Sequence, residues 1–236
     1  MLRDLLTFRA RSSARADLLL GGLTALGLLV IWEVVARSGA VAPQFLPAPS
    51  SVVVALWTMI KDQNMLWHAL VSTGRVLLAF AIAAFMAIPI GMLMSSYRII
   101  GASLEPTIDF IRYLPVPALV PLSIIWFGVG ETTKIFLLWL GTFFQLVLLV
   151  ADDMRRVPQE YVEVAFTLGA KPRNVLTDVA FRAMSPTLVD NLRITLGWCW
   201  TYLVLAEIVA ADSGLGFVIW SARRYVKTPE VMAGVV

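Results

Sequence analysis

The residues best suited to recognising another molecule lie in a polar stretch, residues 158–186, between two strongly apolar segments. Glu160 and Glu163 suit the first turn of a helix, where a carboxylate faces the positive end of the helix dipole. Gly169 readily adopts the left-handed conformation that ends many helices, and Pro172 fits the first turn of a second helix. The stretch therefore predicts two short helices with a bend at Gly169, a shape that can be offered to a partner in the water.

The sequence has few residues that could form a catalytic or metal site. The chain has one histidine, His68, and one cysteine, Cys199, which lies in an apolar run, so it has neither a disulfide framework nor a His/Cys metal site. Its acids are scattered and are not spaced as a nucleophile with its base. A Gly-x-x-x-x-Gly-Lys-Ser/Thr phosphate loop is absent, so a partner must bind any nucleotide. We expect a protein with no catalytic residues and no metal site.

The composition places the chain in a lipid bilayer. Hydrophobic residues make up 59% and charged residues 15% of its 236 residues. Soluble domains average about 45–50% and about 25% respectively. The formal charge of +3 comes from basic residues near the ends of apolar segments, as membrane topology signals do. We expect contact with membrane lipid and no nucleic-acid partner.

Five apolar segments are long enough to cross a bilayer, for which a helix needs about 20 residues. The third is interrupted by prolines and overlaps the fourth. No internal repeat or linker divides the chain, which predicts one membrane domain over residues 1–236. The predicted spans are about 18–36, 69–95, 105–134, 133–151 and 191–211.

The basic residues predict the orientation of the chain. Four arginines precede the first apolar run, so the tail 1–17 is expected in the cytoplasm, as is the polar loop 158–186. A cleaved signal peptide is the alternative for the first run. That run has 19 residues, whereas the apolar core of a signal peptide has about 7–15, so we favour an uncleaved span.

The segment that follows the first span, residues 37–66, begins with three prolines and then Ser50 and Ser51. The prolines predict an extended entry, and the serines are good N-cap residues. We expect a short helix on the outer membrane surface and assign it no function.

A path for solute is expected where a membrane-spanning helix is interrupted or carries polar side chains within the bilayer. Prolines break the third span, and the carbonyl groups that they release need protein or water partners. The aromatic residues of the fifth span either line the path or pack the core. Glu207 is a functional candidate or part of an internal salt bridge, and Arg75 is expected to extend to the lipid headgroups. The candidate path residues are Arg112, Pro115, Pro117, Pro121, Ser123, Trp198, Tyr202 and Glu207.

Motifs in two regions resemble one family. Glu163-x-Ala165-x-x-x-Gly169, followed by Val179 and an exit at Pro186, resembles the cytoplasmic EAA loop of permease subunits of ABC importers. Phe181-Arg182 departs from the Leu-Pro that is frequent there. The broken third span resembles the nitrate/sulfonate/taurine/bicarbonate branch of these permeases, and the likeness extends over about residues 69–235. The matching residues there are Glu105-Pro106, Arg112, Pro115, Pro117-Ala118-Leu119, Pro121-Leu122, Trp126-Phe127-Gly128, Gly130-Glu131 and Lys134.

The resemblance implies an all-α fold, a polytopic membrane helical bundle like that of type I ABC importer permeases. The chain would supply five spans and the start of a sixth. Residues 217–236 end in an apolar stub too short to cross, so we expect a chain truncated at its C-terminus. The resemblance also implies that Glu207 and the turn at 213–216 belong to a family pattern of Glu followed by Gly-Leu-Gly.

The resemblance further implies a non-catalytic permease subunit in the bacterial inner membrane that imports a small anion. Its partners would be two copies of an ABC ATPase subunit, which hold ATP and Mg, and a periplasmic or lipid-anchored binding protein. The permease would be a homodimer, with a heterodimer as the alternative. The polar loop would dock the ATPase through Glu160, Glu163, Ala165, Gly169, Ala170, Lys171 and Arg173.

Two other function classes compete with this interpretation. A secondary transporter or channel would carry its own ion sites on broken spans, but the sequence has few intramembrane carboxylates and no inverted repeat. An integral-membrane enzyme would need the catalytic groups that are missing. Co-purification with an ATPase separates the importer from both.

Overall fold

The computed structural model describes residues 14–210 and 212–235, in which every regular element is a helix. This confirms the predicted all-α class. By their internal contacts the residues form two compact units, one of residues 65–218 and one that joins the chain up to 64 with the chain from 219 onward. The prediction of one membrane domain stays a prediction. The predicted cytoplasmic tail, 1–17, lies mostly outside the described residues.

The unit that contains both chain ends is built from α2 (Ala14–Arg37), α3 (Pro49–Asp62), α12 (Thr228–Val235) and the C-terminal half of α11 (Leu215–Arg224). The helix predicted within 37–66 is confirmed as α3, but the N-cap prediction was wrong. Ala48 is the N-cap residue, and α3 starts at Pro49 without a side-chain cap. The Ser50 hydroxyl instead donates to Glu33 at 2.8 Å, because this carboxylate is within reach from α2.

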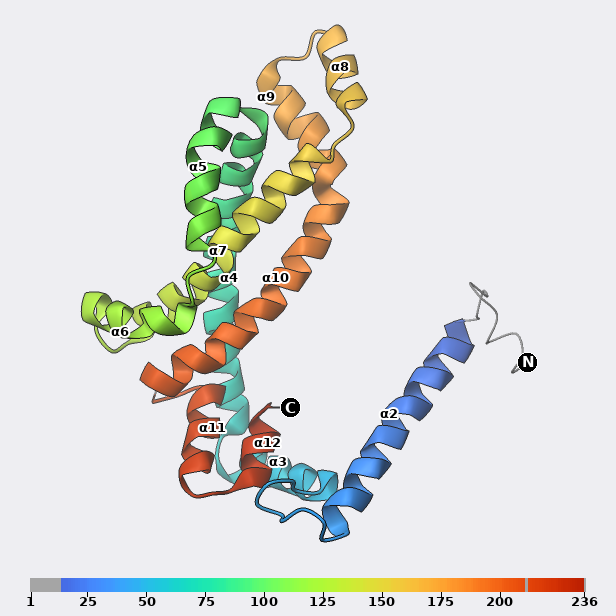
Figure 1. Ribbon diagram of the computed structural model, residues 1–236, viewed down its shortest axis with the longest axis vertical. Coiled ribbons are helices and arrows are strands. Elements are labelled where there is room, and N and C mark those ends of the chain that lie inside the picture. The colour runs from blue at the N-terminus through green and yellow to red at the C-terminus, as the bar shows by residue number, and fades with distance from the viewer. Residues whose placement is uncertain (1–13, 211, 236) are drawn as a thin grey trace. The chain divides into compact units, whose positions relative to one another are not determined.

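The other unit is organised on three long helices, α4 (Met65–Ser96), α7 (Glu131–Arg155) and α10 (Phe181–Ala210) (Figure 1). Helices α4 and α7 pack closely because small residues of α4 face aliphatic residues of α7. A Cβ atom at Gly91 would lie 2.7 Å from the Val147 carbonyl oxygen, so only glycine permits this approach. The buried core of this contact contains Ala83, Ala87, Leu146, Val147 and Val150.

The predicted break in the third span is confirmed. Helix α5 (Arg98–Ile111) and helix α6 (Val116–Phe127) meet at an angle of 97°. The break lies before Pro115, which is the N-cap of α6. Pro117 occupies the first turn of α6, where its missing N–H costs nothing, and Pro121 lies inside the same helix.

The predicted helix end at Pro186 was wrong. After α8 (Gln159–Thr167), the chain runs through α9 (Pro172–Asn174) and the π-helix η1 (Val175–Ala180) directly into α10, which contains Pro186. Proline removes the N–H that would bond the Arg182 carbonyl group. The Ser185 hydroxyl donates to that carbonyl at 2.8 Å, so the helix continues.

Three described helices, α2, α4 and α7, are long and apolar enough to cross a membrane, or four spans if the bent pair α5 and α6 counts as one. The prediction of five spans plus the start of a sixth therefore stays a prediction in its count. Helix α10 contains residues 191–210 of the segment expected as the fifth span, and it carries polar residues along its length.

Candidate functional site

Gly169 closes the exposed helix α8 as predicted. Its φ angle of +82° lies in the left-handed region. Its N–H donates to the Phe166 carbonyl at 2.9 Å, and the Ala170 N–H donates to the Ala165 carbonyl at 3.0 Å. This pair of bonds is a Schellman motif, which satisfies carbonyl groups at the end of the helix. It sets the turn through which α8 returns onto η1.

Helix α8 presents a mixed acidic and apolar surface. Glu160 and Glu163 are exposed, and after them Val164 is 58% and Leu168 82% exposed. Ala165 lies on the opposite side and is buried, where α8 packs against η1. Carboxylates beside exposed apolar side chains suit a protein partner.

The remaining predicted coupling residues follow the bend. Ala170 is partly buried, and Lys171 and Arg173 are exposed at the start of α9. All seven predicted coupling residues therefore lie in α8, in α9 or in the turn that connects them, a segment that precedes η1 and the N-terminal end of α10 (Figure 1).

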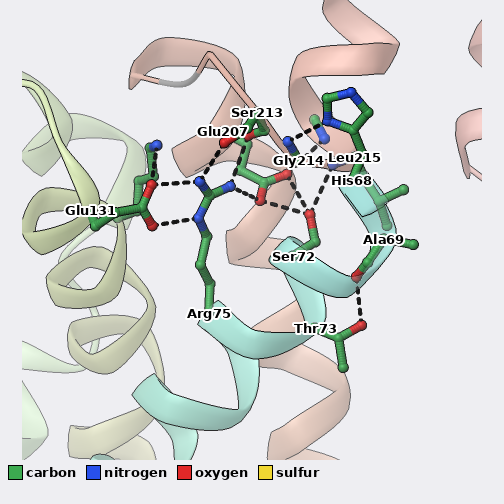
Figure 2. A network of polar contacts seen from close by, with 12 residues as sticks. His68, Ala69, Ser72, Thr73, Arg75, Glu131, Glu207, Ser213, Gly214 and Leu215 are labelled. Atoms are coloured by element: carbon green, nitrogen blue, oxygen red, sulfur yellow. Dashed lines mark hydrogen bonds and ion pairs between the residues drawn. The ribbon is translucent and has the colours of Figure 1, made fainter. Parts of the chain in front are cut away.

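An ionic network joins α4, α7 and α10 at the other end of this unit, with Arg75, Lys134 and Glu207 buried and Glu131 54% exposed (Figure 2). The Arg75 guanidinium binds Glu131 through two nitrogens, at 2.6 Å from Nε and 2.5 Å from Nη2. Its Nη1 lies 2.6 Å from Glu207 Oε1. Lys134 Nζ bonds Glu131 at 2.8 Å. Two cations thus balance two carboxylates, and Arg75 and Glu207 are only 4% and 0% exposed.

Glu207 also fixes the turn before α11. Its carboxylate accepts hydrogen bonds from the Ser72 hydroxyl at 2.7 Å and from the Gly216 N–H at 2.8 Å. The Leu215 N–H donates in turn to the Ser72 hydroxyl oxygen at 2.8 Å. Gly214 has a φ of +110°, and a Cβ atom there would overlap the Glu207 carboxylate. The glycines of this turn therefore allow its backbone to approach a buried carboxylate.

The ionic network shows that the prediction for Arg75 was wrong, and it shows which contacts Glu207 makes. Arg75 does not extend to the headgroups, because two carboxylates hold it inside the helix bundle. Glu207 forms the internal salt bridge that was one of its two alternatives. Sequence reasoning missed Glu131 and Lys134 as partners. The available signal was physical, since charges within apolar helices need opposite charges nearby.

A separate small cavity of about 50 Å³ lies where the α5–α6 bend faces α7 and α10. Three predicted path residues, Arg112, Trp198 and Tyr202, line it. The others do not: Ser123 is buried and donates to the Leu119 carbonyl, and Glu207 belongs to the ionic network. The predicted prolines shape α6 but are not among the lining residues, which are Ile111, Arg112, Leu114, Val116, Leu140, Gly141, Phe144, Gln145, Trp198 and Tyr202.

Comparison with known proteins agrees with this architecture. The model of the family described as "binding-protein-dependent transport system inner membrane component" matches residues 79–236. The taurine transport system permease protein TauC of Escherichia coli is 37% identical over 213 residues, 88% of this chain and 78% of the relative. The bicarbonate transport system permease protein CmpB of Synechococcus elongatus is 29% identical over 89% of this chain and 79% of the relative.

The comparison with solved structures concerns the fold. A solved structure of the MetNI methionine ABC transporter, in inward facing conformations, has a TM-score of 0.63 to this chain. The matched region covers 76% of this chain and 87% of the MetNI chain, at 16% sequence identity. The likeness confirms the predicted fold.

Proposed function

Because the chain belongs to the family of binding-protein-dependent transport system inner membrane components, we propose that it is the permease subunit of an ATP-driven importer and that α8 docks its ATPase. The observation that carries this proposal is the helix pair closed at Gly169. It presents exposed acids and apolar side chains on one short helix, outside the apolar spans. ATP and Mg belong to the partner, and the permease itself performs no chemistry.

Helix α10 provides the mechanical connection that such coupling requires. It follows η1 without interruption and runs to Ala210, passing Trp198, Tyr202 and Glu207. At 1.5 Å per residue, its 30 residues span about 45 Å. A displacement of the docking helices by the ATPase is therefore transmitted along α10 to the cavity and to the ionic network, because a continuous helix moves as a rigid element.

The substrate that we propose is a small anion of the sulfonate, taurine, bicarbonate or nitrate type. The support is the pair of relatives named for taurine and bicarbonate transport. A periplasmic or lipid-anchored binding protein delivers it. The permease works as a homodimer in the bacterial inner membrane, because a two-fold pair encloses a path and offers two docking helices to two ATPase copies. The N-terminus lies in the cytoplasm.

Uptake by the reconstituted complex tests the function. The permease, its co-purifying ATPase and the binding protein are placed in proteoliposomes, and entry of radiolabelled taurine and bicarbonate is followed. We expect uptake of at least one of these solutes to require ATP on the side of the membrane that carries the ATPase. Uptake should stop when the ATPase is replaced by a variant that binds ATP but does not hydrolyse it. Uptake driven by a proton or sodium gradient without ATP would instead identify a secondary transporter.

A further inference from the structure

We propose that the cavity at the α5–α6 bend is an anion-binding subsite in which the Arg112 side chain holds the oxyanion headgroup of the solute. This inference rests on the proposed function for its place in transport. The binding itself follows from the cavity's donors, charge and size.

Arg112 has a hydrogen-bond donor that no protein group uses. Its Nη2 lies 2.8 Å from the Tyr113 hydroxyl and 2.7 Å from Asp109 Oδ1. Its Nη1 reaches Gln145 Oε1 only at 3.5 Å, the limit of a hydrogen bond. Its Nε is buried and has no hydrogen-bond partner among the described residues. Native structures rarely leave a cation so incompletely paired. Because Nη1 carries two N–H groups and makes one hydrogen bond at the distance limit, it keeps a donor that a ligand can use.

The charge around the cavity favours an anion. Arg112 is the only charged residue among the ten that line it, and none of the ten is acidic. Its one ion-pair partner, Asp109, is 49% exposed and outside the cavity lining, where water screens it. Three other lining residues, Gln145, Trp198 and Tyr202, have side chains that can donate a hydrogen bond to an oxyanion.

Arg75 in the same unit shows what a saturated arginine looks like. All three of its nitrogens contact carboxylates, and two of these nitrogens also bond Ser213. Its guanidinium therefore has no capacity for a ligand. Arg112 differs from Arg75 because its hydrogen bonding is incomplete and because it lines a cavity. Arginine is well suited to this role, since its planar fork matches the geometry of oxyanions.

The size of the cavity limits the ligand. About 50 Å³ holds a few water molecules, which is the scale of a sulfonate or bicarbonate group and not of a larger solute. Gly141 helps to keep this space open. A Cβ atom there would lie 2.5 Å from Tyr202 Cδ2, so an alanine would force the Tyr202 ring to move. The class of ligand is therefore a small oxyanion, bound headgroup first.

Binding to the purified permease, without ATPase, tests the subsite directly. Tryptophan fluorescence is titrated with taurine, methanesulfonate and bicarbonate, and with dimethyl sulfone as an uncharged analogue of methanesulfonate. We expect a saturable change with at least one oxyanion, none with dimethyl sulfone, and loss of the signal in Trp198→Phe. Arg112→Gln should raise the dissociation constant by about tenfold or more, which is the scale of one charged hydrogen bond.

Three further variants separate charge, space and folding. Arg112→Lys keeps the charge and should bind more weakly than the parent but more tightly than Arg112→Gln. Gly141→Ala should weaken binding with Arg112 intact. Arg98→Gln removes an exposed charge from the opposite end of α5, the helix that Arg112 follows, and should bind like the parent. Binding that is absent in the parent, or unchanged in Arg112→Gln, overturns the subsite. Binding that follows these expectations without any ATP-driven uptake overturns the proposed function alone.

Discussion

Replacing Gly169 by valine is expected to abolish recovery of the ATPase with the permease and to abolish uptake, with the permease still present in the membrane. The φ angle of Gly169 is +82°, and a β-branched residue is a strained occupant of that region. A Cβ atom at this position would meet nothing within 4 Å, so the expected effect comes from the backbone conformation. Strain of about 1–3 kcal/mol would open the Schellman turn and turn α8 away from η1.

The open space around Gly169 supplies a matched control. Asparagine tolerates the left-handed conformation, so Gly169→Asn should keep ATPase recovery and uptake within about threefold of the parent. ATPase pull-down and uptake are measured at equal membrane abundance of each variant. If Gly169→Val recovers as much ATPase as Gly169→Asn, the bend at Gly169 does not position the docking helix.

Breaking the ionic network is expected to have the largest effect on stability. Arg75→Leu leaves Glu131 and Glu207 with only Lys134 to balance them, so a buried carboxylate loses its counter-charge. Removing one partner of a buried pair typically costs about 3–5 kcal/mol. We expect lower membrane abundance and a clearly lower temperature of aggregation in detergent, measured by size-exclusion chromatography after heating. Glu207→Leu should behave similarly.

The double variant Arg75→Leu/Glu207→Leu distinguishes lost charge balance from lost packing. It restores a balance of one cation and one carboxylate, so it should be more stable than the sum of the single changes predicts. The recovery should be partial, because the Gly216 N–H and the Ser72 hydroxyl lose their acceptor. Arg37→Ala, which breaks a solvent-exposed pair with Glu33, should leave the stability close to that of the parent. Equal stability of the parent and of both network single variants would show that the network contributes nothing.

The features predicted correctly depend on local chemistry. The break of the third span follows from prolines whose rings and missing N–H groups cannot be accommodated in one straight helix. The bend at Gly169 follows from the acids, the glycine and the proline around it. In both cases the residues that decide the backbone lie within a few positions of one another.

The features that were missed depend on partners elsewhere. Pro186 stays in α10 because the Ser185 hydroxyl replaces the lost bond at Arg182, a compensation that the proline alone does not reveal. Arg75 is held by carboxylates 56 and 132 residues further along the chain. Its expected extension to the headgroups was reasonable for an isolated helix and wrong for a bundle.

The cavity shows an intermediate case. The sequence predicted Arg112, Trp198 and Tyr202 as path residues, and the structure brings these three together. The sequence did not point to Gln145 or Gly141. Which residues of α7 face the bend depends on the rotation of α7 about its axis, and that rotation is set by packing. The role of the cavity in transport is a proposal for which the incomplete pairing of Arg112 beside the cavity is the main support.

Chemical cross-linking from α8 to the ATPase tests the central claim most directly, that this helix is the docking element of an ATP-driven permease. A cysteine at Val164, which is 58% exposed, is placed in a Cys199→Ala background and linked with a short maleimide–succinimide reagent to lysines of the co-purified ATPase. A cysteine at the exposed residue Phe85, in the apolar span α4, is the control. We expect a permease–ATPase product from Val164→Cys alone. Its absence in every nucleotide state of an intact complex would contradict the account.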